Sequence, residues 1–183
     1  MIPGANVLSG LMVAWLLAGS GTIAAQVTTP YAGQEQRAIK ALAPEEVDGY
    51  LAGRGLGLAK AAELNGYPGP MHVLELADRL QLSSQQRVAT QAIFARMQVK
   101  ARELGERLVA EELALDRAFR DRNINANELT QRLAAIGKLH AEVRGAHLEA
   151  HLAQTDVLSP LQVQRYASLR GYGEGEHPHV HKH

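Results

Sequence analysis

Two histidines lie four residues apart in the segment His147-Leu-Glu-Ala-His151. On a helix this spacing puts both imidazole rings on one face, within reach of a single metal ion. His140 precedes His147 by two helical turns and falls on roughly the same face. A transition-metal site needs a further ligand, which His72, Glu142 or a residue of a partner chain could supply. The alternative is that His140 and His147 are hydrogen-bonded histidines of a helix interface.

A second group of histidines ends the chain and alternates with Pro, Val and Lys after a Gly-Glu-Gly-Glu spacer: His177, His179, His181 and His183. This alternation differs from the continuous histidines of a purification tag. A flexible His-rich tail binds zinc, nickel, cobalt or copper with little geometric selection. The alternative is a solvated terminus without a biological role in metal binding. We expect no required cofactor.

The chain lacks the patterns of known catalytic sites. Glu149 lies about 200° around a helix from His147, so it points away from any ion there and excludes a zincin-type metalloprotease. The glycine-rich segment 53–60 lacks the Gly-Lys-Ser/Thr ending of a phosphate loop. We find no Ser/His/Asp order, no supported carboxylate pair and no aromatic platform for bases. The sequence therefore indicates that the protein is not an enzyme.

Composition narrows the class further. The 183 residues suit a single domain, with 19 Lys+Arg against 19 Asp+Glu and no cysteine. Zero net charge argues against nucleic-acid binding, since phosphate neutralisation needs a basic face. The absence of cysteine excludes disulfides, thiol catalysis and cysteine-based metal sites.

The first 34 residues carry no charged side chain, and all formal charges lie beyond them. Residues 7–18 form an apolar run of signal-peptide length, and small residues follow as far as Ala25. Ile23 and Ala25 suit the −3 and −1 positions of a cleavage site, so we expect residues 1–25 to be a signal peptide and the protein to be periplasmic. An uncleaved anchor in the inner membrane, or a buried N-terminal helix, is the alternative; an anchor would need about 20 apolar residues.

Helical signals dominate the rest, and no alternating strand pattern occurs. Residues 26–70 read as a lead-in with a short helix that begins at Pro44, a glycine break, and a Gly/Pro-rich turn. A short helix is expected over Met71–Leu80. The residues 173–183 form the tail, so the helical domain spans 71–172.

Three capping signals delimit the remaining helices. Ser83 with Gln86 opens a helix to about Arg120, Asn125 with Glu128 opens one to about Gln154, and Ser159 with Gln162 opens the last, to about Leu169. The two long helices carry apolar stripes at steps of three and four. The stripe residues are Ile93, Met97, Ala101, Leu104, Leu108, Leu115 and Phe119, then Leu129, Leu133, Ile136, His140, Val143, His147 and Ala150.

These elements predict an all-α fold: a long antiparallel helical hairpin with short flanking helices. Helices of this length make a hairpin about 45–55 Å long. A two-helix layer leaves part of its apolar stripes uncovered. The short helices can cover some of that surface, and self-association into a dimer can cover the rest.

Two of the capping signals share a longer pattern. Leu82-Ser-Ser-Gln-Gln86 and Leu158-Ser-Pro-Leu-Gln162 both read Leu-Ser-x-x-Gln. The region from Val73 to Tyr172 resembles the LTxxQ-motif family of periplasmic proteins, which is Spy/CpxP-like and related to the metal-responsive ZraP and CnrX. Both copies carry Ser where the family usually has Thr, a conservative change because either hydroxyl can cap a helix. The resemblance does not extend to residues 31–70.

The resemblance implies an all-helical, cradle-shaped homodimer in the periplasm. Spy-like members hold unfolded clients without ATP on a concave, partly apolar and charged surface. ZraP-like and CnrX-like members add metal binding through histidines. The motif residues Ser83, Gln86, Ser159 and Gln162 would then be structural, each cap contributing about 0.5–2 kcal/mol.

Three functions follow from these observations. The first is a chaperone or stress protein whose partners are unfolded periplasmic proteins or a membrane sensor protein. In it, the mixed charges of residues 100–122 would border the client surface. The second is a heavy-metal binding protein or sensor that uses the helix and tail histidines. The third is a structural or adaptor dimer with neither activity.

Overall fold

The structure is a computed structural model that describes residues 29–172. The chain divides into two compact units after Ala32, and the second unit begins at Gly33. Its elements are a 3-10 helix, η1 (Gln34–Gln36), and the helices α1 (Pro44–Leu51), α2 (Lys60–Glu63), α3 (Pro70–Glu75), α4 (Ser84–Arg120), α5 (Ala126–Val157) and α6 (Pro160–Arg170). No strand occurs in residues 29–172, so the all-α prediction is confirmed for this part.

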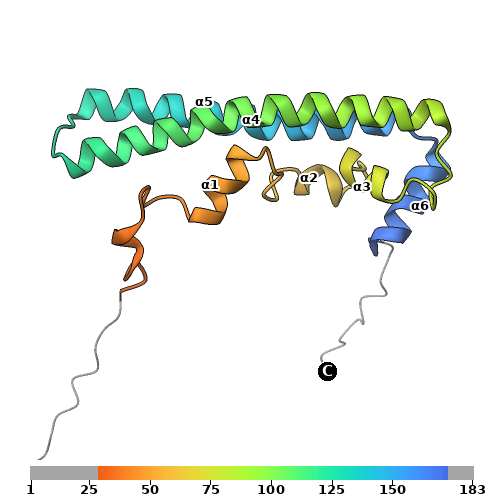
Figure 1. The fold of residues 1–183 in the computed structure, drawn as a ribbon, viewed down its shortest axis with the longest axis horizontal. Helices are drawn as coiled ribbons and strands as arrows, with labels where there is room; N and C mark the ends of the chain where they lie inside the picture. The colour runs from red at the N-terminus through yellow and green to blue at the C-terminus, as the bar shows by residue number, and fades with distance from the viewer. Residues whose placement is uncertain (1–28, 173–183) are drawn as a thin grey trace, which may run out of the picture. The chain divides into compact units, whose positions relative to one another are not determined.

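The two long helices lie side by side (Figure 1), joined by residues 121–125. Contacts between them pair early residues of α4 with late residues of α5: Thr90 with Gln154, Lys100 with Glu149, and Glu112 with His140. The two helices therefore run in opposite directions. Within the described residues, no helix is long and apolar enough to span a membrane.

The short helices α1, α2 and α3 pack along this pair, α1 mainly on α4 and α2 on α5. One core joins residues 39–50 to both long helices, and it contains Ile39, Leu42, Tyr50, Leu104, Leu108, Ile136, Leu139, Val143 and Ala146. A second core lies where α3 and the turn after it meet α6, and it contains Val73, Ala77, Leu80, Leu82, Leu158 and Tyr166. Residues 33–70 therefore form a covering layer rather than a simple lead-in.

One glycine lets α1 approach α4 closely. A Cβ on Gly105 would collide with the backbone carbonyl of Tyr50, and no flexible side chain stands between them. Gly105 and Tyr50 are both buried. A side chain at position 105 would therefore push the end of α1 off the long helix.

Several helix boundaries differ from the sequence prediction. The helix expected over 71–80 ends at Glu75, because the chain then turns and Gln81 takes a left-handed φ of 53°. The helix expected to end near Gln154 continues to Val157. The expected capping box at Asn125 is half made: Asn125 accepts from the Glu128 N–H, but the Glu128 side chain accepts from Arg132 instead.

Two residues placed on the apolar stripes are exposed. Phe119 is 55% exposed and Leu133 is 51% exposed. Both lie toward the connector of the long helices. The buried members of the first core nearest the connector are Leu108 and Ile136, and Leu113 and Leu115 beyond Leu108 are only partly buried against it. Periodicity identified the right face of each helix, but it could not tell how far along that face the covering layer reaches.

Candidate functional site

The two Leu-Ser-x-x-Gln motifs meet at one end of the helix pair. Gln86 Nε2 donates to Gln162 Oε1 at 2.8 Å, and Gln162 Nε2 donates to Gln86 Oε1 at 3.1 Å. The same two oxygens accept the backbone N–H groups of Ser83 and Ser159, at 3.0 and 2.9 Å. Each serine hydroxyl in turn accepts the N–H of its own glutamine.

Each glutamine also reaches across to the backbone of another segment. Gln86 Nε2 donates to the Val157 carbonyl at 3.0 Å, and Gln162 Nε2 donates to the Leu80 carbonyl at 3.2 Å. An amide has two donors and two acceptor positions, and in both side chains all four are filled. The motifs therefore act as a clamp between the starts of α4 and α6, in addition to capping each helix.

A cavity of about 420 Å³ lies between the covering layer and the long helices. We call it the histidine cavity. It is lined by His147 and His151 of α5, Phe94, Met97 and Gln98 of α4, the glycine-rich loop 52–57, Ala59, Lys60 and Glu63, and residues 69–72. The loop that the sequence analysis rejected as a phosphate loop thus forms one wall of this cavity.

His147 is 3% exposed, and its buried Nε2 has no hydrogen-bond partner within residues 29–172. Its Nδ1 faces the glycine-rich loop, 3.9 Å from where a Cβ of Gly55 would lie. Burial, and then the neighbouring His151, lowers the pKa of His147 below its ordinary value of 6.5. The ring is therefore a neutral, buried imidazole near neutral pH.

His151 is anchored by the turn before α3. Its Nδ1 lies 2.7 Å from the Tyr67 carbonyl oxygen and 3.7 Å from Glu63 Oε2. Since a carbonyl oxygen only accepts, Nδ1 carries the proton and donates to it. A Cβ on Gly69 would lie 3.0 Å from the ring, so the close approach depends on glycine.

Glu63 links this region to α6. Its Oε1 accepts from the hydroxyls of Tyr166 and Tyr172, at 2.6 and 3.1 Å, and lies 3.5 Å from Arg170 Nε. Its Oε2 accepts from the Gly69 N–H. Burial first, and then the bond to Glu63, raises the pKa of Tyr166 well above its ordinary range. The charge of Glu63 is thus balanced on the α6 side.

Of the other proposed metal ligands, two lie outside the histidine cavity and one is bonded to a neighbouring side chain. His140 packs edge-on against Tyr50, with its Nε2 3.7 Å from Glu112 Oε1. Glu142 Oε1 lies 3.8 Å from Lys138 Nζ and forms an ion pair with it. His72 does line the cavity, but its Nδ1 bonds to Glu75. Within the described residues, no group of three or more His, Asp or Glu lies close enough to hold a metal ion.

The remaining predicted metal ligands, His177, His179, His181 and His183, lie outside the described residues, as does the predicted signal peptide. Metal binding by zinc, nickel, cobalt or copper stays a prediction for both the tail and the helix.

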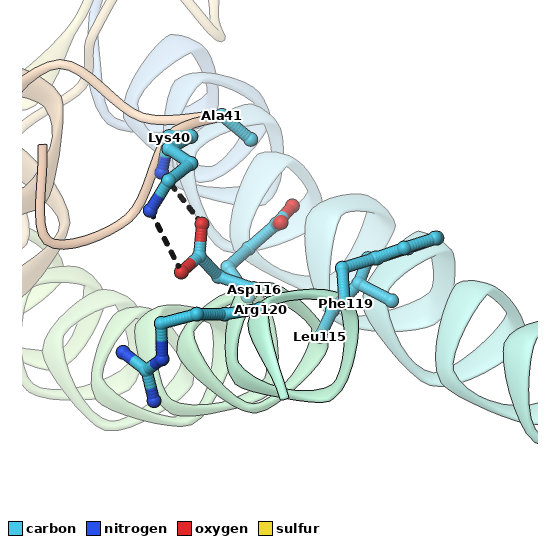
Figure 2. Close-up of a pocket in the computed structure, with 7 residues that line it drawn as sticks. Lys40, Ala41, Leu115, Asp116, Phe119 and Arg120 are labelled. Atoms are coloured by element: carbon cyan, nitrogen blue, oxygen red, sulfur yellow. Dashed lines mark hydrogen bonds and ion pairs between the residues drawn. The ribbon is translucent and has the colours of Figure 1, made fainter. Parts of the chain in front are cut away.

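A second hollow, the Phe119 notch, opens between the segment before α1 and the second half of α4. It has a volume of about 500 Å³ and is lined by Lys40, Ala41, Glu112, Leu115, Asp116, Phe119 and Arg120. Lys40 binds Asp116 through both its backbone N–H and its ammonium group, at 3.1 and 3.3 Å. Figure 2 shows Phe119 and Leu115 extending away from this pair.

The helical spacing of Phe119 on the apolar stripe gave no indication of this notch. Phe119 is one of two phenylalanines in the chain, the other being Phe94 in the histidine cavity. A scarce aromatic near the end of a helix, four residues past Leu115 and among alternating charges, is the signal that could have pointed to an exposed site.

Comparison of the chain with protein-family models finds no match, and comparisons with curated proteins and with solved structures find none either.

Proposed function

We propose that the protein is a periplasmic, Spy/CpxP-like stress protein that binds unfolded polypeptides without ATP. In this proposal residues 1–25 are removed on export, and two copies of the α4–α5 hairpin form a cradle-shaped homodimer. The observation that carries it is the Phe119 notch, where a 55% exposed phenylalanine lies among charged side chains.

An exposed aromatic side chain in a hollow suits weak binding of many apolar segments. Burying its ring against a client removes apolar surface from water without requiring a particular hydrogen-bond pattern. The ion pair Lys40–Asp116 and the exposed Arg120 border the hollow with both signs of charge. Such a border attracts polar flanks of either sign and speeds encounter more than it tightens binding.

The clamp formed by Gln86 and Gln162 supports the family resemblance on which the periplasmic role rests. A helix cap alone needs only the serine hydroxyl and one glutamine oxygen. Here the two motifs bind each other through both amides, which gives a reason for a paired Leu-Ser-x-x-Gln pattern in one chain.

The test is suppression of client aggregation by Phe119→Ser. We expect the full chain to suppress aggregation of several unrelated, chemically denatured clients at stoichiometric amounts, in the absence of nucleotide. Phe119→Ser should lower this activity at least about fivefold because it removes the anchor of the notch. Light scattering measures the aggregation.

The matched control is Leu161→Ser, which removes an apolar side chain that is 73% exposed on α6, away from the notch. It should retain activity, and both variants should keep the wild-type melting temperature. Equal activity in Phe119→Ser and the wild type would contradict the role of the notch. No suppression by the wild type with any client would contradict the proposed function itself.

A further inference from the structure

The histidine cavity has one charged rim that the fold does not use. Arg54 and Lys60 both line the cavity and are exposed. Within residues 29–172, neither side chain makes a hydrogen bond or an ion pair. Of the acidic residues, only Glu63 lines the cavity, and its charge is balanced by Arg170 and two tyrosine hydroxyls. The rim is therefore net positive toward an incoming ligand.

Another part of the cavity lining is apolar. It consists of Phe94 and Met97 of α4, which are half-buried, together with the exposed side chains of Leu56 and Met71. Methionine side chains are flexible and polarizable, so they adapt to an unbranched apolar body. The volume of about 420 Å³ falls in the range of small-molecule sites, roughly 300–1,000 Å³.

His147 adds a buried polar group to the cavity lining. Its Nε2 is buried and has no hydrogen-bond partner within the described residues. Its Nδ1 faces the glycine-rich loop that carries Arg54, so an oxygen bound at that loop is a suitable acceptor when Nδ1 holds the proton.

We propose that the histidine cavity binds a small amphipathic carboxylate, with its anionic group at Arg54 and Lys60 and an unbranched apolar body against Phe94 and Met97. The charge and the apolar wall are both needed: two cations form charge-assisted hydrogen bonds to the carboxylate, and the chain of methylenes leaves water. This site is separate from the Phe119 notch, and its occupant is a small molecule rather than a polypeptide.

The test is calorimetric titration of the full chain with octanoate, in the presence of a chelator so that the tail histidines hold no metal. We expect saturable binding of one octanoate per chain. The uncharged probe octan-1-ol should bind at least about tenfold more weakly, a factor that corresponds to about 1.4 kcal/mol. The double variant Arg54→Gln/Lys60→Gln should lose at least the same factor for octanoate and little for octan-1-ol.

The control is Arg107→Gln, which removes an exposed cation of α4 that does not line the cavity. It should bind octanoate as the wild type does, and so should Phe119→Ser, which separates this site from the proposed client surface. Absence of saturable octanoate binding would overturn the proposal. Equal affinity for octanoate and octan-1-ol, or undiminished octanoate affinity in the double variant, would also overturn it.

Discussion

In Gln86 and Gln162, every donor and acceptor position of the side-chain amide has a hydrogen-bond partner. Each amide oxygen accepts a backbone N–H of its own helix start and an N–H of the other glutamine, while each amide nitrogen donates twice. Glutamate is as good as glutamine in a capping box, but it has no N–H to donate. The clamp therefore requires an amide, whereas the caps alone do not.

Gln86→Glu should consequently destabilise the protein by about 1–3 kcal/mol. The substitution places a carboxylate oxygen against the Val157 carbonyl and the Gln162 oxygen, where donors are needed. Urea unfolding followed by circular dichroism measures the change. The control is Glu46→Gln at the N3 position of α1, where a side-chain oxygen accepts the Ala43 N–H and an amide oxygen can do the same. It should change stability by less than about 0.5 kcal/mol. Equal effects of the two variants would refute the clamp.

His147 makes stability depend on pH. Its pKa is lowered in the folded protein by burial and by His151, so the unfolded chain binds a proton more readily. Above its ordinary pKa of 6.5 the ring is neutral in both states and adds no pH dependence to stability. As the pH falls below 6.5, the unfolded state gains a proton that the folded state does not, and stability declines.

We expect the unfolding free energy to fall between pH 7.5 and pH 5, with a His147 contribution of at most about 1.4 kcal/mol per pH unit. His147→Gln should reduce that slope, whatever its effect on stability at pH 7.5. His72→Gln removes a histidine on the cavity rim instead and serves as the control. If both variants change the slope equally, burial of His147 is not the cause.

At the scale of elements, the contact of α1 with α4 depends on a glycine inside a long helix. Glycine weakens a helix interior by roughly 0.5–1 kcal/mol relative to alanine. At Gly105 this loss is offset by close packing, because only a residue without a Cβ lets the Tyr50 backbone approach α4. At Gly137 on α5 nothing lies within 4 Å of the Cβ position. The low helix propensity of glycine there is therefore not offset by closer packing.

Alanine at these two glycines should therefore have opposite effects. Gly105→Ala should destabilise the protein by about 1–3 kcal/mol, because the added methyl group forces α1 away from α4 and loosens the core between them. Gly137→Ala should stabilise it by about 0.5–1 kcal/mol through helix propensity alone. Urea unfolding measures both. Stabilisation by Gly105→Ala would mean that α1 does not pack as described.

A helix begins at the position expected from the sequence when a capping side chain can bond to the backbone N–H three residues later. Ser83 and Ser159 begin α4 and α6 at the expected places because the box is complete in the sequence. Glu128 leaves the Asn125 box because Arg132, one turn later, offers a charged partner. The helix after Pro70 stops early because Val73, Ala77 and Leu80 reach the second core through a turn.

At the scale of the whole molecule, apolar side chains remain exposed along α4 and α5. They include Val88, Val99, Phe119, Leu133 and Leu152. We expect two copies to cover part of this surface, so sedimentation equilibrium of the chain from Gln26 should give twice the monomer mass. A monomeric mass at micromolar concentration would contradict the homodimer.

The alternating histidines of residues 177–183 predict a metal site that does not involve His147 or His151. Removing residues 173–183 should lower affinity for nickel, copper or zinc at least about tenfold in calorimetric titrations. His147→Gln with His151→Gln should change it less, since both rings are buried and His151 donates to Tyr67. If the helical variant loses affinity and the truncated chain keeps it, the helix is the metal site.

The sequence by itself determined the all-α class, the starts of α4, α5 and α6, and the apolar face of each long helix. Those features depend on residues three or four positions apart, and such pairs are neighbours on any helix that contains them. Only the tertiary structure decided that Gln86 meets Gln162, that His147 and His151 share a cavity without His140, and that Phe119 is exposed. Each depends on how residues 33–70 and α6 pack against the long helices, and spacing within one helix carries no information about that packing.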